Sequence, residues 1–143
     1  MRKALIMAAA LAVAAPALAA DIGLIKVSKG NVQIQRGSEK LPAAVGAGLQ
    51  VSDTIVTGAD GSAGITFTDN SLVSVGPNSV FSVDKYSFDT TTHQGEFSGN
   101  LKQGRLAAVS GKMVKQSPES MTIRTPSAIM GVRGTEFVVQ VDK

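Results

Sequence analysis

Apolar and polar residues alternate singly along several stretches of this chain. The alternation is clearest at 30–37, at 62–68 and in the run 136–141. A period of two places alternate side chains on opposite faces of an extended strand, so that one face meets a core and the other meets water. Further short strands are predicted at 72–75, 80–83, 96–101, 105–109 and 121–124.

Turn-forming residues separate these runs at intervals of about 8 to 12 residues. Glycine and asparagine tolerate positive φ, and proline restricts φ, so such residues end strands. Turns are predicted at Arg36-Gly37, Ala59-Asp60-Gly61, Asp69-Asn70, Gly76-Pro77-Asn78, Gly99-Asn100, Gln103-Gly104, Ser110-Gly111 and Thr125-Pro126. No long segment carries a helical apolar stripe, and only 43–49 indicates a short helical turn. The predicted class is therefore all-β.

Both a β-solenoid and a β-sandwich satisfy this pattern. The stretches 71–79 and 120–128 resemble one another, because each opens with serine and has proline six residues later. Such internal similarity is expected of successive coils of a solenoid, or of turns that occupy equivalent positions in the fold. The chain has no Trp and five Phe, so we expect a core of small aliphatic side chains in thin layers. These observations leave the two architectures open.

The first residues have the organisation of a secretory signal peptide. A positive start, Met1 to Lys3, precedes an apolar run at 4–15 and an A-x-A cleavage site at 17–19. We therefore expect residues 1–19 to be removed and 20–143 to form one domain in the periplasm or outside the cell. No later run is long enough to span a membrane. With no Cys, neither a disulfide nor a lipid anchor is expected.

In order and spacing, several of these runs resemble the FecR domain of bacterial envelope proteins. The stretch 30–37 resembles its opening strand. The stretch 51–79 resembles its central signature, with an acidic residue before isoleucine, a Thr-Gly turn, an Asp-x-Ser element and a proline. The stretches 104–109 and 125–139 resemble its closing elements. The resemblance implies a small twisted β-solenoid-like module, which makes the β-sandwich the alternative. Ser52 and Asn70 stand where the family often has glycine.

The resemblance also implies a place in the cell envelope. Regulators of this family carry a cytoplasmic anti-sigma segment, a membrane helix and a further signalling domain that receives a message from an outer-membrane siderophore transporter. None of these is evident in the 143 residues. We therefore expect a stand-alone exported protein that does not contact a cytoplasmic sigma factor, and a link to iron uptake stays open.

The most distinctive stretch lies near the C-terminus. Its residues are expected to form a tight corner between two strands, with glycines where a Cβ would not fit and an arginine over the turn carbonyls. The alternative is that the arginine binds a ligand. The residues concerned are Thr125, Pro126, Gly131, Arg133, Gly134, Thr135 and Phe137.

Positive charge gathers in the C-terminal part of the chain. Residues 20–98 hold five Lys or Arg and eight Asp or Glu, whereas residues 99–143 hold seven and three. Four cations fall in a stretch without an acid: Lys102, Arg105, Lys112 and Lys115. They are either solvated or form a surface for lipopolysaccharide phosphates, anionic lipid or an acidic protein. Nucleic acid is not expected, because few aromatics are available for base stacking.

No pattern in the chain indicates catalysis, a metal or a cofactor. His93 is the single histidine, so the usual zinc set is missing and His93 is expected in a surface loop. Asp53, Asp60 and Asp69 do not have the spacing of a calcium loop. We therefore expect a non-enzymatic module that binds an envelope protein or surface. The alternative is a structural component that self-associates or binds cell-wall glycan.

Overall fold

The computed structural model describes residues 21–132 and 136–141. The predicted signal peptide, 1–19, and three residues of the predicted C-terminal corner, Arg133, Gly134 and Thr135, lie outside the described residues. In the described part, twelve strands and one short helix follow one another along the chain. They are β1 (Gly23–Lys29), β2 (Val32–Arg36), β3 (Glu39–Pro42), β4 (Gly48–Leu49), β5 (Thr54–Thr57), β6 (Ser62–Phe67), β7 (Leu72–Val75), β8 (Val80–Phe88), β9 (Gly95–Val109), α1 (Lys112–Gln116), β10 (Met121–Arg124), β11 (Ile129–Gly131) and β12 (Glu136–Val141).

The all-β prediction is confirmed, and the predicted strands are all present. Five strands were not predicted, namely β1, β3, β4, β5 and β11, and neither was the helix α1. The helical turn expected at 43–49 is wrong. Ala47 N donates to Ala44 O at 2.9 Å in a tight turn, and the chain then enters β4.

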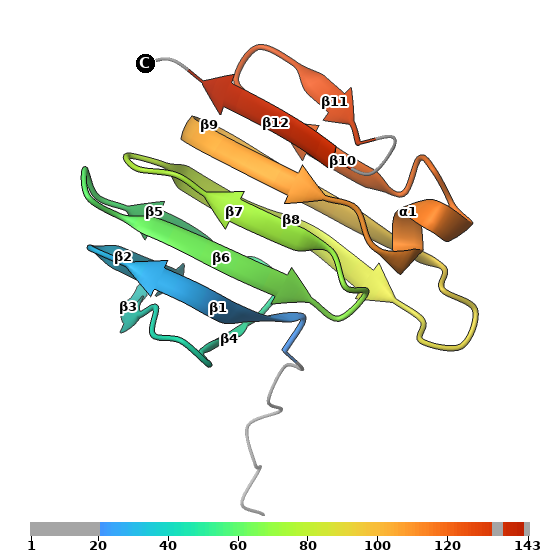
Figure 1. Ribbon diagram of the computed structural model, residues 1–143, viewed down its shortest axis with the longest axis horizontal. Coiled ribbons are helices and arrows are strands. Elements are labelled where there is room, and N and C mark those ends of the chain that lie inside the picture. Colours follow the sequence, from blue (N-terminus) through green and yellow to red (C-terminus); the bar gives the residue numbers. More distant parts are fainter. Residues whose placement is uncertain (1–20, 133–135, 142–143) are drawn as a thin grey trace, which may run out of the picture.

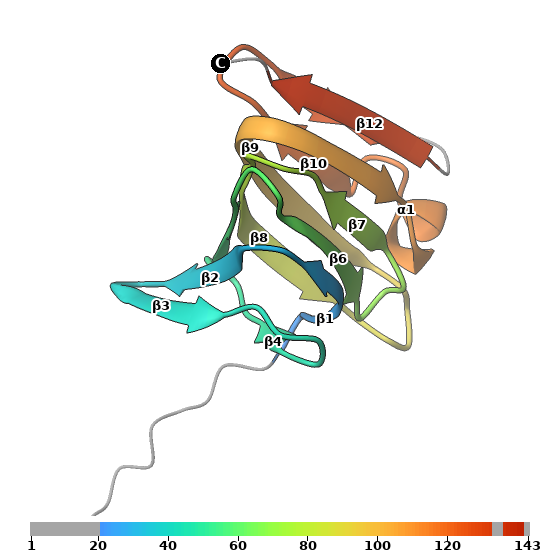
Figure 2. The ribbon, with the colours of Figure 1, turned by 60° about the vertical axis from the view of Figure 1, so that its left-hand side comes forward.

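The strands form one sheet that curls into a half-barrel (Figures 1 and 2). Its two halves face each other, and β9 belongs to both. We call them layer A and layer B. Layer A runs in the order β4-β1-β6-β7-β9-β12, and layer B runs in the order β3-β2-β5-β8-β9-β10-β11. The β-solenoid stays a prediction, with the β-sandwich as its alternative.

The bend that takes β9 from one layer to the other lies at Gly104. The first part of β9 pairs with β8 as far as Gln103, and the part from Leu106 onward pairs with β7. Gly104 has a backbone φ of +94°, which residues with a Cβ rarely adopt. The turn predicted at Gln103-Gly104 is therefore a bend within a continuous strand, which Figure 2 shows.

The core lies between the two layers and uses the buried face of every long strand. Layer A contributes aliphatic residues such as Ile25, Val73 and Leu106, all fully buried. The expectation of a core without large aromatics is wrong, because Phe67, Phe81 and Phe97 are also fully buried. Phe67 and Phe97 meet edge to face, with their ring centroids 4.9 Å apart. Such aromatic pairs stabilise a core beyond the burial of their area.

We predict that Gly104→Ala destabilises the protein by about 2–4 kcal/mol. A Cβ at this position would lie 2.5 Å from Ser79 Cα, and the positive φ adds backbone strain. Chemical denaturation gives the change in free energy of unfolding. Gly37→Ala is the matched control, because Gly37 also has positive φ (+62°) but has open space around it. Equal losses in the two variants would show that the close approach to Ser79 is unimportant.

Candidate binding face

The outward faces of the two layers differ in chemistry. The outward residues of layer B are mostly polar, as at Gln33, Asn100 and Thr122. Layer A instead carries five of the eight large hydrophobic side chains that are exposed among the described residues. These five are Leu24, Val27, Leu72, Val109 and Val138. Contiguous exposed apolar surface of this kind commonly marks an interaction site.

Small residues make the middle of this face flat. Cross-strand pairing places Val27 beside Gly64, Gly64 beside Ser74, and Ser74 beside Ala107. The same row ends at Val138 on β12, which pairs with Ala107. A neighbouring row runs from Leu24 through Thr66 and Leu72 to Val109, all exposed or half-buried. We call this surface, from β1 to β12 on the outside of layer A, the layer A face.

A shallow hollow of about 340 Å³ lies over the small residues of the layer A face. Its walls include Val27, Gly64, Ser74 and Ala107, and Arg105 lies at its edge. A second hollow of about 170 Å³ shares Val27, Gly64 and Ser74 with the first and reaches Lys26. The two hollows therefore run together across the face between one cation on β9 and another on β1.

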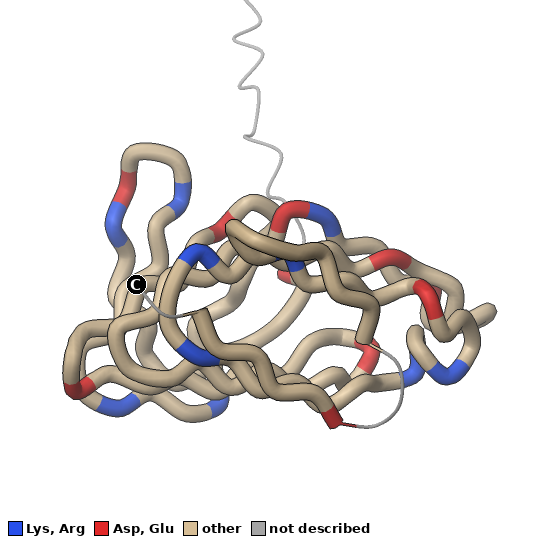
Figure 3. Tube along the Cα trace, turned by 90° about the horizontal axis from the view of Figure 1, so that it is seen from above, with Lys and Arg blue, Asp and Glu red and all other residues tan. Residues whose placement is uncertain are grey.

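The four predicted cations do not share one surface. Arg105 follows the bend of β9 and lies on the layer A face, whereas Lys102 precedes the bend and is exposed on the layer B side. Lys112 and Lys115 belong to α1, which follows the end of β9 and which Figure 1 places away from the bend of that strand. Figure 3 shows positive and negative residues interspersed around the trace. The structure thus places Arg105 on the same face as Lys26, a residue that the sequence did not single out, with β6 and β7 between their two strands.

In the described part of the C-terminal stretch, one turn and two strands are formed. Thr125 N donates to Ala128 O at 2.8 Å, and Ala128 N donates to Thr125 Oγ1 at 3.1 Å, so Thr125 closes the turn that contains Pro126. Phe137 on β12 packs against the core. Gly131 lies at the end of β11, where a Cβ would meet no atom within 4 Å and φ is not positive. Among the described residues, therefore, no atom approaches Gly131 closely, and the predicted corner stays a prediction because 133–135 lie outside them.

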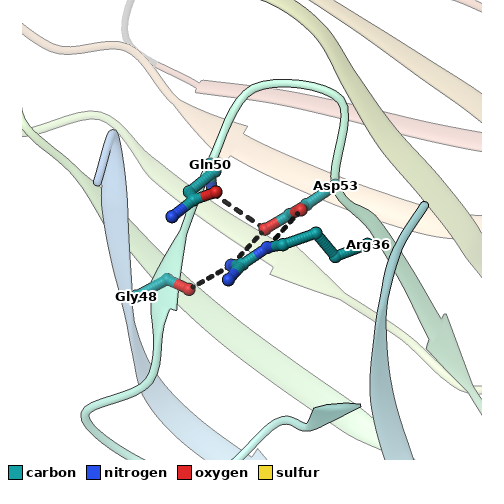
Figure 4. A network of polar contacts seen from close by, with 4 residues as sticks. All are labelled: Arg36, Gly48, Gln50 and Asp53. Atoms are coloured by element: carbon teal, nitrogen blue, oxygen red, sulfur yellow. Dashed lines mark hydrogen bonds and ion pairs between the residues drawn. The ribbon is translucent and has the colours of Figure 1, made fainter. Parts of the chain in front are cut away.

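Asp53, the acidic residue of the family-like signature, stabilises a corner of layer B. We use the word corner for a place where the chain leaves one strand and turns toward the next. The Asp53 carboxylate is 1% exposed and pairs with Arg36, whose Nε and Nη2 donate to its two oxygens at 3.0 and 2.8 Å (Figure 4). Gln50 N donates to the same carboxylate at 2.8 Å, and Arg36 Nη2 also donates to Gly48 O at 3.2 Å. These hydrogen bonds to Asp53, with its charge, raise the pKa of Arg36. The pair ties β2 to the loop before β5.

The Asp-x-Ser element forms a second corner. Buried Asp69 accepts hydrogen bonds from Ser71 N at 3.0 Å and from Ser71 Oγ at 2.7 Å. Ser71 Oγ accepts one in turn from Gly111 N at 3.0 Å. The Tyr86 hydroxyl lies 3.3 Å from Asp69 Oδ1 and 2.8 Å from Thr68 Oγ1. Burial, the largest effect, raises the pKa of Tyr86 to about 12, although the Thr68 hydrogen bond opposes this.

The Thr-Gly turn and the proline element meet at a third corner. Thr57 Oγ1 donates to Gly76 O at 2.6 Å and accepts from Ser79 N at 2.9 Å. Arg105 N donates to Ser79 Oγ at 2.9 Å, which fixes the chain just after the bend of β9. The side chains at all three corners hydrogen-bond to backbone groups, so the signature residues build architecture.

The three aspartates that were considered as calcium ligands do not lie together. Asp53 and Asp69 belong to different corners, and Asp60 Oδ1 accepts from Asn31 N at 3.3 Å. In residues 21–132 and 136–141, no group of three or more His, Cys, Asp or Glu is arranged to hold a metal ion. His93 lies in the β8–β9 loop, as predicted. Its ring stacks on that of Phe88, with the two ring centroids 5.9 Å apart. In the same loop, the backbone N–H groups of Thr92 and Thr91 lower the pKa of Asp89.

Comparison with known proteins identifies one family. The sequence model of the FecR family, described as FecR protein, matches residues 53–143. No curated protein matches the chain, and no solved structure does. Among the described residues, no helix has the length and apolar character needed to cross a bilayer. The match covers the second and third corners, the bend of β9 and most of the layer A face.

We predict that Arg36→Met lowers the free energy of unfolding by about 2–3 kcal/mol, because it leaves the buried Asp53 carboxylate without its cation. Asp53→Asn should cost less, since its neutral amide oxygen still accepts the Gln50 hydrogen bond. A double-mutant cycle measured by denaturation tests the coupling. Additive losses in the double variant would contradict a direct role for the pair.

We also predict that Tyr86 titrates at about pH 12 in the folded protein and at about pH 10 in the denatured chain. A raised folded-state pKa means that the folded protein keeps a proton that the unfolded chain has lost. Stability should therefore fall as the pH rises from about 10 to about 12. Tyr86 is the single tyrosine and the chain has no Trp, so tyrosinate absorbance reports it cleanly. A folded-state midpoint near the denatured value would contradict the burial of this hydroxyl.

Proposed function

The chain belongs to the FecR family, and from this membership we propose that it is an exported, non-catalytic module that acts in the bacterial cell envelope by contact with another protein. Membership suggests a role in envelope signalling or sensing. The contact surface in this proposal is the layer A face. Residues 1–19 act as the export signal in this account, and the folded domain works in the periplasm or outside the cell.

The observation that carries this proposal is the contrast between the two outward faces. The layer A face presents Gly64, Ser74 and Ala107 in one cross-strand row, with exposed valines at both ends of it. A flat row of small side chains lets another protein surface approach closely. The polar side chains that close the corners are buried and do not line the hollows of this face.

The charges at its margin indicate the chemistry of the partner. Arg105 and Lys26 flank the two hollows, and Lys29 is exposed nearby on β1. Glu136, beside Val109, is an acid at the far corner. A partner with an apolar centre and carboxylates toward the cations would be complementary to this face. In this account the Lys102, Lys112 and Lys115 side chains contribute to steering rather than to the contact itself.

The path of the chain supports the solenoid form of the fold within this proposal. The chain passes from layer A at β1 to layer B at β2, returns at β4, and repeats such crossings through to β12. A coil of short strands gives a rigid, elongated face, which suits a module that works by contact. The turn closed by Thr125 belongs to this architecture.

We predict that Ser74→Glu reduces capture of the envelope partner at least tenfold, or about 1.4 kcal/mol in binding free energy. The new side chain would fill the hollow and repel carboxylates of the partner. The measurement is a quantitative pull-down of envelope proteins by the purified exported protein. Arg105→Gln should weaken binding less, and mainly at low salt.

The matched control is Gln33→Glu, which adds the same charge to an exposed outward position of layer B. It should bind as the unsubstituted protein does. If Ser74→Glu and Gln33→Glu both retain the captured proteins, the layer A face is not the contact surface. Circular dichroism verifies that each variant is folded.

A further inference from the structure

The strand β6 forms the floor of a trough on the layer A face. Its outward residues are small, namely Ser62, Gly64, Thr66 and, just beyond its end, Thr68. Three hollows follow one another along it. The hollow of about 340 Å³ that reaches Arg105 lies over the start of the strand, the hollow of about 170 Å³ lies over its middle, and a third, also of about 340 Å³, continues to Thr68. We call this depression the β6 trough, and it extends about 20 Å along the strand.

Larger side chains border the β6 trough on both sides. The neighbours of β6 in the sheet are β1 and β7. On β1, Leu24 and Val27 are 38% and 46% exposed, and on β7 Leu72 is 46% exposed. An apolar ridge of a partner laid along the trough would therefore contact apolar side chains on both flanks, and the small residues of the floor would leave room for it.

The position of β6 within the sheet limits the kind of backbone that can lie over it. Both edges of β6 are already paired, one with β1 and the other with β7. A partner in the trough cannot extend the sheet, and an extended segment there would bring backbone groups without hydrogen-bond partners against apolar side chains. An α-helix satisfies its own backbone groups and commonly packs an apolar stripe on a sheet or in a groove. The trough therefore favours a helix, of which about 13 residues span 20 Å.

The charged residues are placed unequally along the trough. At the end where β6 begins, cross-strand pairing forms a row over β1, β6, β7 and β9: Lys29, Ser62, Gly76 and Arg105. The two cations are three strand spacings apart, or about 14 Å, with only a serine and a glycine between them. A helix is about 10–12 Å wide, so that its end fits between these cations. At the other end of the trough, Asp21 lines the third hollow.

We infer that an amphipathic α-helix of the partner lies in the β6 trough, with its C-terminal end between Lys29 and Arg105. The partial negative charge of a helix C-terminus, and acidic side chains in its last turn, are complementary to two cations. In the part of the chain that the structure describes, neither cation is in an ion pair. Lys26, beside the middle of the trough, would face an acid on the flank of the helix. This inference rests on the proposed function, because it names the element by which the partner contacts the layer A face.

The occupant is tested with a synthetic peptide of about 16 residues, which is long enough to span the trough as a helix. Its ends are blocked, its leucines repeat at i, i+3, i+4 and i+7, and glutamates occupy its last turn. Fluorescence anisotropy with the purified exported protein should show binding about tenfold or more tighter than that of a twin peptide with two central prolines, which cannot form the helix. Ser74→Glu should weaken binding of the helical peptide, because Ser74 lines two of the hollows. Equal affinities of the two peptides, or no binding by either, would overturn the inference.

The orientation is tested by moving the glutamates to the first turn of the peptide without changing its composition. This peptide should bind about threefold or more weakly, because its acids can face the two cations only if the positive end of the helix does so too. The double variant K29E/R105E should abolish the preference. The matched control K40E/K85E, which makes the same change of charge on exposed residues of layer B, should retain it. A preference for the first-turn peptide, or one that K29E/R105E leaves intact, would overturn the orientation.

Failure of this inference is distinguishable from failure of the proposed function. If Ser74→Glu abolishes capture of the envelope partner while the helical and the proline-containing peptides bind alike, the layer A face is the contact surface but its occupant is not a helix. If Ser74→Glu retains capture, the proposed contact surface itself is wrong. Circular dichroism verifies that each protein variant is folded.

Discussion

The half-barrel depends on hydrogen bonding at the places where the chain leaves one strand and enters another layer. Backbone groups in such corners lose their ladder partners, and buried groups without partners cost stability. Three corners solve this with side chains: Asp53 with Arg36, Asp69 with Ser71, and Thr57 with Ser79. Each joins segments that are distant in sequence or closes a turn that the next strand needs. The apolar layers can pack only when these corners are closed.

This requirement explains why residues that resemble the family signature hydrogen-bond to the backbone at the corners. A carboxylate or hydroxyl at a corner must reach particular backbone N–H groups, so its identity and spacing are narrowly specified. The side chains of the layer A face need only be small or apolar and point outward. Corner residues therefore form a motif that can be read in the sequence, whereas the residues of the proposed contact surface form none.

Much of the fold could be predicted from the alternation of apolar and polar residues, because that alternation is the direct consequence of a half-buried strand. The strands β6, β7 and β12 follow it closely. The strand β1 was missed because a register shift between Ile25 and Val27 interrupts its alternation. Gly104 was predicted to lie in a turn between strands. Glycine accommodates positive φ equally well in such a turn and in a bend within one strand, so the sequence does not distinguish the two.

The candidate site was far less predictable, since cross-strand neighbours are set by register and not by sequence distance. Val27, Gly64, Ser74 and Ala107 come from four strands, and only pairing makes them one row. The basic residues 102–115 are close in sequence, yet the bend at Gly104 directs Lys102 and Arg105 to different layers. A strand that changes layers divides a sequence cluster and leaves Arg105 on the same face as Lys26. In this fold, the bend of β9 sets both the closure of the core and the composition of the surface that is left for a partner.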